Sequence, residues 1–250
     1  MKSLKPLKWY KGLASGKERA NSGVFLIEGD RGVEQVVKNQ PEAIVEIVVV
    51  EGLAVGFRGY QVRYVPASQF KSICTAKTPQ GILAVVRLPR YTYSGVLPED
   101  VGNRVLLLED VQDPGNVGAL IRSAVAFGYS GIVMSDKCAD PFSPKCVQST
   151  AGTLLSLWIR RTTSYVELIA ELKRRGYMII AADLNGRESP SILSRFDALV
   201  LALGNEASGL SESVIAISDY CCNIPIERER AESLNVAACG AICMYLSAEK

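Results

Sequence analysis

A short polar turn, with an apolar run before it and a helical pattern after it, carries the residues best suited to chemistry. The run at 105–108 is followed by the cluster Asp-Pro-Gly-Asn at 113–116 and then by apolar residues at helical spacing. Backbone N–H groups at the start of such a helix attract anions. Arg122 lies four residues after Gly118, about one helical turn, so its guanidinium can reach the same space. The pattern predicts a phosphate-handling site, with an ordinary strand-to-helix turn as the alternative interpretation.

Two later segments also place glycines and polar residues directly after predicted strands. They are LALGNEASGLS at 201–211 and IPIERERAESLNVAACGA at 224–241. Ligands of open α/β sheets collect outside the carboxyl ends of the strands, so three such segments can converge on one pocket. A dinucleotide site is the competing interpretation of the first turn, with Asp136 as the acid that binds the ribose. It is the weaker one, because Gly115 and Gly118 do not have the GxGxxG spacing and the later segments are left without a role.

The elements that must position these residues belong to an α/β protein of two domains, because predicted strands and helices alternate on both sides of a stretch rich in proline and glycine. We expect a small α/β domain at 1–90, a linker at 91–102 and a second domain at 103–250. Apolar strands separated by helices predict a mostly parallel sheet in the second domain. Strands are expected at 24–28, 43–50, 62–65, 81–86, 105–108, 131–134, 157–159, 177–182, 198–203 and 220–224. Later helices are expected at 145–155 and 234–246, with a polar connection at 184–194.

The composition restricts the chemistry that is open to the chain. Of the 250 residues, 48% are hydrophobic and 22% charged, as is typical of a soluble globular protein. No apolar run approaches the ~20 residues of a membrane span, and no secretory signal opens the chain. Histidine is absent, which excludes Ser-His-Asp and Cys-His catalysis. The seven cysteines contain no CxxC pair, so we expect no metal site and interpret them as buried thiols in a reducing compartment.

Basic charge is concentrated at the start of the chain, although the net charge is only +2. Apart from Trp9 and Tyr10, we interpret residues 1–22 as a polar, mobile tail that either binds nucleic acid or is merely solvated, with a transit peptide as a further alternative. Its basic residues are Lys2, Lys5, Lys8, Lys11, Lys17 and Arg19.

The three glycine-containing segments together resemble motifs one, two and three of the SpoU (TrmH-like) RNA 2′-O-methyltransferases of the SPOUT class, over about residues 103–247. The first domain, with FLIEG and KTPQGILAVV, is similar to the ribosomal-protein-like substrate-binding domain that often precedes such a catalytic domain. The resemblance implies a small substrate-binding domain followed by a mostly parallel-sheet domain with a deep trefoil knot near its carboxyl end. It also implies a homodimer that uses S-adenosylmethionine to methylate a ribose 2′-hydroxyl of RNA, with rRNA favoured over tRNA. The reducing compartment inferred from the cysteines leads us to expect a cytoplasmic protein. A non-catalytic RNA-binding protein of the same fold is the alternative.

Two sets of positions match functional residues of that family. The resemblance implies a catalytic set of Arg122, Asn116, Glu206, Ser233 and Asn235. It implies a cofactor-binding set of Leu203, Gly204, Ile224, Ile226 and Leu234. Because a guanidinium is not readily deprotonated, Arg122 is better suited to hold the flanking phosphate than to act as a base. Ser233 has an alternative role as the cap of the last helix. The sequence departs from the family pattern at 227–230, where Glu-Arg-Glu-Arg stands in place of an early glycine and leaves the conformation of this loop open.

Overall fold

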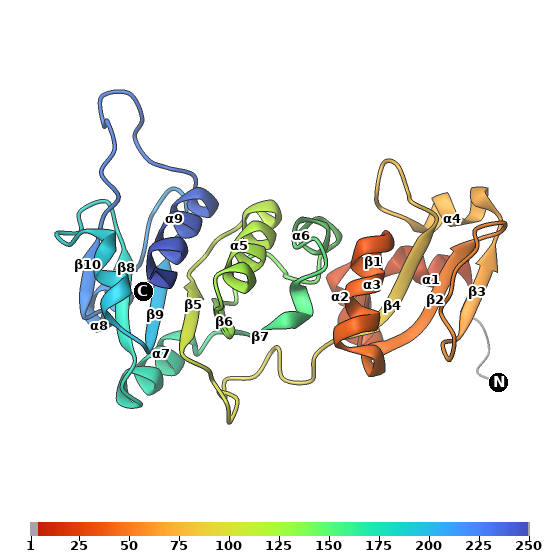
Figure 1. Cartoon of the computed structure of the whole chain (residues 1–250), viewed down its shortest axis with the longest axis horizontal. Helices are drawn as coiled ribbons and strands as arrows, with labels where there is room; N and C mark the ends of the chain where they lie inside the picture. The colour runs from red at the N-terminus through yellow and green to blue at the C-terminus, as the bar shows by residue number, and fades with distance from the viewer. Residues whose placement is uncertain (1–4, 250) are drawn as a thin grey trace. The chain divides into compact units, whose positions relative to one another are not determined.

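The chain forms two compact units in the computed structural model, which describes residues 5–249 (Figure 1). The first unit contains the chain up to Arg90 together with Asp140–Leu155. The second contains Tyr91–Ala139 and the chain from Ser156 onward. Residues 140–155 therefore pack with the first unit, although in the sequence they lie within the second predicted domain.

The first unit is built on a four-stranded sheet with helices packed around it. Its strands are β1 Val24–Glu28, β2 Ile44–Val50, β3 Val62–Val65 and β4 Ile82–Arg87. Its helices are α1 Leu7–Gly12, α2 Gly16–Ser22, α3 Asp30–Asn39, η1 Pro41–Ala43, α4 Ala67–Ile73 and α6 Pro144–Ser149. The strand order is β1-β4-β2-β3, with β4 antiparallel to β1 and β2, and β2 parallel to β3. β2 and β4 are the most deeply buried strands, which explains their β-branched and aliphatic composition.

The basic start of the chain is not a mobile tail, and this prediction is wrong for residues 5–22. They form α1 and α2, and the side chains of Tyr10 in α1 and of Leu13 just after it are buried. These two residues are three positions apart, so they share one helical face that packs into the core. Arg19, one of the basic residues, is only 3% exposed and donates a hydrogen bond of 2.8 Å to the carbonyl oxygen of Leu13. Residues 1–4 of the predicted tail lie outside the described residues.

The second unit contains a six-stranded sheet in which all neighbouring strands are parallel. Its strands are β5 Arg104–Leu108, β6 Gly131–Ser135, β7 Trp158–Thr162, β8 Met178–Ala182, β9 Leu199–Leu203 and β10 Tyr220–Cys222. Its helices are α5 Pro114–Ala126, η2 Leu154–Ser156 at the junction of the units, α7 Tyr165–Arg174, η3 Pro190–Arg195, α8 Glu212–Ile217 and α9 Val236–Ala248. The strand order is β10-β8-β9-β5-β6-β7. The predicted α/β class and the predicted parallel sheet are confirmed.

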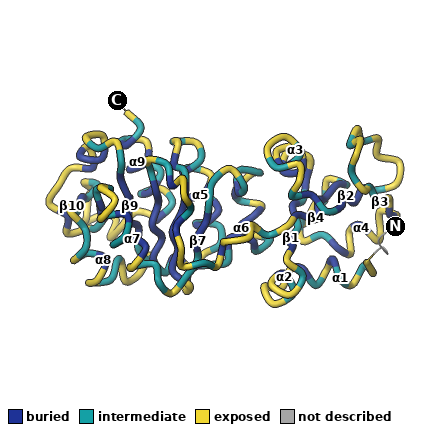
Figure 2. The backbone as a smooth tube through the Cα atoms, turned by 90° about the horizontal axis from the view of Figure 1, so that it is seen from below, coloured by how far each residue is buried: buried dark blue, intermediate teal, exposed yellow. Residues whose placement is uncertain are grey.

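The central strands of this sheet are buried along nearly their whole length (Figure 2). Strands covered on both faces need continuous apolar runs, and β5 and β9 supply them. Leu108 and Leu203 are paired at the carboxyl ends of the two strands. The loops that leave these two ends therefore start side by side, which brings the first and second glycine-containing segments together.

Three elements differ from the sequence-based expectation. The helix expected at 145–155 ends early because Ala151 and Gly152 take positive φ values of 50° and 91°. The connection expected at 184–194 contains the short helix η3. The last helix begins at Val236, two residues later than expected, because Asn235 caps it. Within residues 5–249, no helix is long and apolar enough to cross a membrane.

Candidate active site and cofactor cavity

The first glycine-containing segment folds as the sequence predicts, into a strand, a tight turn and a helix. Asp113 caps α5: its carboxylate accepts hydrogen bonds from the backbone N–H of Gly115 at 2.7 Å and of Asn116 at 3.0 Å. Pro114 occupies the first helical position, where its missing N–H costs nothing. This cap fixes the backbone of Asn116 at the carboxyl end of β5.

Asn116 joins all three glycine-containing segments. Its side-chain N–H₂ donates to Oε1 of Glu206 at 2.7 Å, and its Oδ1 accepts from the side-chain N–H₂ of Asn235 at 3.1 Å. Asn235 is held in turn, because its Oδ1 accepts from the backbone N–H groups of Ala237 and Ala238 at the start of α9. The structure thus brings three of the five predicted catalytic residues into one cluster, which we call the Asn116 cluster (Asn116, Glu206 and Asn235).

The other two predicted catalytic residues make no hydrogen bond to this cluster within residues 5–249. Arg122 is exposed on α5, and its position six residues after Asn116 separates the two side chains by about 120° around the helix axis. Within residues 5–249, no hydrogen bond joins Arg122 to the cluster. Ser233 is exposed and lines the cavity described next. The alternative role proposed for Ser233, as helix cap, belongs to Asn235 instead.

A cavity of about 260 Å³ lies at the carboxyl ends of β8, β9 and β10. All five residues of the predicted cofactor-binding set line it: Leu203, Gly204, Ile224, Ile226 and Leu234. Glu206 and Ser233 of the predicted catalytic set line it as well. The cavity is therefore bordered by apolar side chains, by backbone and by one edge of the Asn116 cluster.

The walls of this cavity suit a ligand with both an apolar and a polar part. A Cβ atom at Gly204 would lie 2.3 Å from the carbonyl carbon of Gly209, so only glycine lets the two backbones approach this closely. Asp183 and Asn185 add a carboxylate and an amide at the end of β8. An adenine ring and a charged amino-acid moiety would find complementary surfaces here, so the residues present fit S-adenosylmethionine.

Several residues that line this cavity were not predicted from the sequence. Asp183 and Asn185 follow the apolar strand MIIAA in a DLNG turn, and this pattern of polar residues after a buried strand was a usable signal. Cys222 and Cys239 also line the cavity. Hydrogen bonding to the thiol of Cys243 lowers the pKa of both Cys222 and Cys239. The spacing of these cysteines did not indicate that they meet, because Cys222 ends β10 whereas Cys239 and Cys243 lie in α9, and the contact forms only when the two elements pack together.

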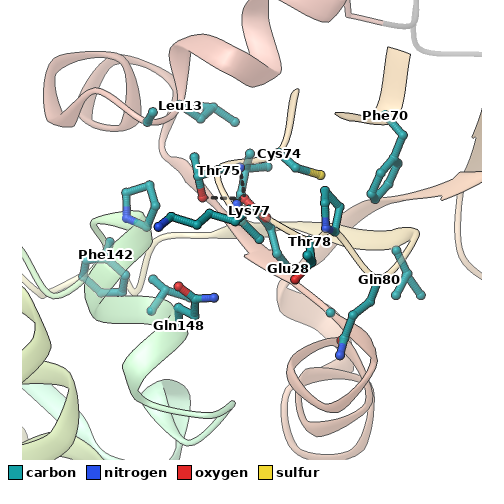
Figure 3. Close-up of a pocket in the computed structure, with 18 residues that line it drawn as sticks. Leu13, Glu28, Phe70, Cys74, Thr75, Lys77, Thr78, Gln80, Phe142 and Gln148 are labelled. Carbon is teal, nitrogen blue, oxygen red and sulfur yellow. Dashed lines mark hydrogen bonds between the residues drawn. The ribbon is translucent and has the colours of Figure 1, made fainter. Parts of the chain in front are cut away.

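The first unit contains a separate cavity of about 570 Å³ (Figure 3). The turn after α4 forms its rim and is held in place by Glu28, whose carboxylate accepts from the backbone and hydroxyl of Thr75 at 2.8 and 2.7 Å. Gln80 on the same turn accepts a hydrogen bond from the backbone N–H of Asp30. The exposed side chain of Lys77 extends across the cavity in Figure 3 and places a cation at this surface. The motifs FLIEG and KTPQG therefore meet at one place.

The parallel sheet, the cavity at the carboxyl ends of its strands and the Asn116 cluster define an α/β ligand-binding domain. The model of the SpoU rRNA methylase family matches residues 103–245, and that of the MRM3-like substrate-binding domain matches residues 5–84. The chain belongs to the SpoU rRNA methylase family.

Known proteins resemble the chain over nearly its whole length. The 23S rRNA (guanosine(2553)-2′-O)-methyltransferase of Bacillus subtilis is 32% identical over 244 residues, covering 96% of this chain and 94% of that protein. The structure of a Porphyromonas gingivalis protein assigned to the TrmH family of RNA methyltransferases is 31% identical, with a TM-score of 0.82 over 99% of this chain and 98% of that one. An AdoMet-bound rRNA methyltransferase from Sinorhizobium meliloti is 26% identical, with a TM-score of 0.82 over 96% of this chain and 93% of that one.

Proposed function

We propose that this chain is an S-adenosylmethionine-dependent RNA 2′-O-ribose methyltransferase that acts on rRNA. The observation that carries the proposal is one cavity lined by all five positions of the predicted cofactor-binding set, with the Asn116 cluster at its edge. The Bacillus subtilis relative is named for methylation of a 23S rRNA ribose, and the Sinorhizobium meliloti relative binds AdoMet. Transfer RNA remains the alternative substrate.

The residues of the site have distinct tasks in this proposal. S-adenosylmethionine supplies an electrophilic methyl group, so the protein has to align the ribose hydroxyl and exclude competing nucleophiles. The backbone at Leu203 and Gly204 holds the cofactor, and the Asn116 cluster orients the ribose. Arg122 binds the phosphate beside the target ribose through its planar guanidinium. Ser233 lies at the cavity wall, where its hydroxyl can hold the ribose or the cofactor.

We infer that the cavity of the first unit contacts the RNA, with Lys77 on the phosphate backbone. This inference is supported by the match to a substrate-binding domain and by the exposed cation at the rim of the cavity. Lys77→Ala should lower RNA affinity and make it less dependent on salt, because one phosphate contact is lost. Lys38→Ala removes an exposed lysine of α3 and is the matched control. Equal RNA affinity of Lys77→Ala and wild type would contradict this contact.

We further propose a cytoplasmic homodimer with a knotted carboxyl-terminal segment. The free cysteines are compatible with a reducing compartment. Ile242 and Tyr245 of α9 are 39% and 51% exposed, and the ring of Phe127 packs against Tyr245. Such an apolar surface suits a second copy of the chain. The family resemblance supports the knot.

The experiment that tests the function uses the purified chain, labelled S-adenosylmethionine and unmodified total RNA, followed by digestion to nucleosides. Label in a 2′-O-methylated nucleoside supports the proposal, and the size class of the labelled RNA distinguishes rRNA from tRNA. Binding of S-adenosylmethionine without any transfer to rRNA or ribosomal particles would contradict the enzymatic proposal. It would favour a non-catalytic RNA-binding protein, the interpretation that the charged loop at 227–230 raises.

A further inference from the structure

A buried carboxylate that the proposed chemistry does not use is hydrogen-bonded to the segment that forms part of the cavity wall. Glu109 follows β5 and is only 4% exposed. Its Oε1 accepts hydrogen bonds of 2.6 Å from the hydroxyls of Tyr165 and Ser211, and its Oε2 accepts one of 2.7 Å from the backbone N–H of Ser211. A buried carboxylate is costly unless donors compensate it, and Glu109 has three. Two of the three come from Ser211.

The same residue also holds the other end of the segment that Ser211 closes. The backbone N–H of Glu109 donates to the carbonyl oxygen of Leu203 at 2.9 Å and so extends the pairing of β5 with β9 by one residue. Between Leu203 and Ser211 runs the cavity loop (residues 204–211), which carries Glu206 and much of the cavity wall. Glu109 is thus hydrogen-bonded to the residues at both ends of this loop, Leu203 through its backbone and Ser211 through its side chain.

Asp110, the next residue, adds a further hydrogen bond to the loop. Its φ of 56° lies in the left-handed region, which aspartate tolerates better than most residues. In this conformation its carbonyl oxygen accepts from the side-chain N–H₂ of Asn205 at 2.8 Å, and its carboxylate accepts from Ser135 at 2.6 Å. Asn205 also closes the loop on itself through two backbone hydrogen bonds with Gly209. The loop is therefore a closed turn anchored to residues 109–110.

We propose that Glu109 is a positioning residue that sets the cavity loop for cofactor binding. It touches neither cavity nor substrate and acts through Leu203 and Ser211. The consequence for the cofactor rests on the proposed function, whereas the consequence for the loop does not. Loss of the carboxylate leaves the N–H of Ser211 without an acceptor, so the loop should open more readily.

The test compares three variants by hydrogen exchange of residues 204–211 without cofactor and by calorimetric binding of S-adenosylmethionine. Glu109→Ala should speed exchange in the loop and weaken binding, each about tenfold or more. Glu109→Gln should restore both to within about threefold, because its amide oxygen accepts from the Ser211 N–H and both hydroxyls can turn to accept from its N–H₂. Tyr165→Phe removes one donor to Glu109 but keeps both contacts with Ser211, so exchange in the loop should stay close to that of the wild type.

Unchanged exchange of the loop in Glu109→Ala would overturn the proposal. So would an equal increase in Tyr165→Phe, because Glu109 would then contribute only to the overall stability of the fold. If Glu109→Ala does not fold, Ser211→Ala removes one of the two Ser211 contacts and must show a smaller increase of the same kind; an unchanged loop there would also overturn it. A wild-type chain that binds no S-adenosylmethionine would contradict the proposed function, and the exchange comparison would still decide the role of Glu109.

Discussion

Among single residues, Arg122 should separate cofactor binding from turnover, because it does not line the cavity and makes no hydrogen bond to the Asn116 cluster within residues 5–249. Arg122→Ala should keep the affinity for S-adenosylmethionine and lower turnover by about 100-fold or more, the usual cost of losing a charge-stabilising group. Arg122→Lys should recover only part of the rate, because an ammonium cannot make the bidentate contact. Calorimetry and initial methylation rates give the two quantities. Turnover near that of the wild type would remove Arg122 from the reaction.

Tyr10 predicts how stability depends on alkaline pH. Burial, together with its hydrogen bond to Glu46, raises the pKa of Tyr10 to about 12 from an ordinary 10.0. The folded protein therefore keeps this proton where the unfolded chain loses it, so stability is unaffected below about pH 10 and falls between about pH 10 and 12. Urea unfolding across this range should show a shallower fall in Tyr10→Phe. The exposed Tyr64→Phe should keep the wild-type slope, and equal slopes for all three proteins would contradict the prediction.

The sequence predicted the residues that line the cavity better than the residues that support its wall. All five predicted positions line the cavity because the motif places them directly at strand ends, where the parallel sheet determines their location. Glu109 also ends a strand, but its donors Tyr165 and Ser211 come from elements distant in the chain. A single sequence shows no pairing over such separations. Ser233, rather than Asn235, was considered as the cap of α9 because the helix was expected to begin at residue 234, whereas it begins at Val236.

At the scale of elements, the cavity loop depends on one close approach of backbone to backbone. In Gly204→Ala the new Cβ would lie 2.3 Å from the carbonyl carbon and 2.4 Å from the oxygen of Gly209, so the loop must move. We expect a loss of about 1–3 kcal/mol in unfolding free energy, and weaker binding of S-adenosylmethionine. Gly56→Ala is the control, because a Cβ there would meet nothing within 4 Å. Denaturant unfolding and calorimetry check both effects, and wild-type values for Gly204→Ala would refute the argument.

The strands were predictable because buried parallel strands need continuous apolar runs, and β5 and β9 read as such runs in the sequence. The helices at the start of the chain were not predicted, because the many lysines there made the apolar residues that include Tyr10 and Leu13 hard to recognise as one buried helical face. α6 was predicted too long because Ala151 gives no local signal for its positive φ. The predictions were therefore wrong at the lysine-rich start of the chain and at the end of α6, where a few buried side chains or a single backbone conformation determine the structure.

For the whole molecule, nothing in the sequence indicated that residues 140–155 belong with the first unit. The contacts responsible are tertiary: the ring of Phe142 packs on that of Phe25, and the carboxylate of Asp140 pairs with the buried guanidinium of Arg19. Each partner is more than a hundred residues away from the other in the chain. A boundary drawn from composition assumes continuous domains, whereas here the chain returns to the first unit between β6 and β7.

At the scale of the whole molecule, the exposed face of α9 allows the proposed homodimer to be tested. Tyr245 is 51% exposed and packs on Phe127, and the nearby Ile242 is 39% exposed. Burial of these apolar side chains in a homodimer would stabilise the dimer. A carboxylate at the centre of the interface should therefore weaken the free energy of association by about 2 kcal/mol or more. Light scattering after size exclusion should give twice the mass of one chain for the wild type and a shift towards monomer for Tyr245→Glu. Tyr64→Glu changes an equally exposed tyrosine, at 52%, on the first unit and should leave the mass unchanged. A monomeric wild type, or a Tyr245→Glu variant that associates as the wild type does, would place the dimer interface elsewhere or remove it.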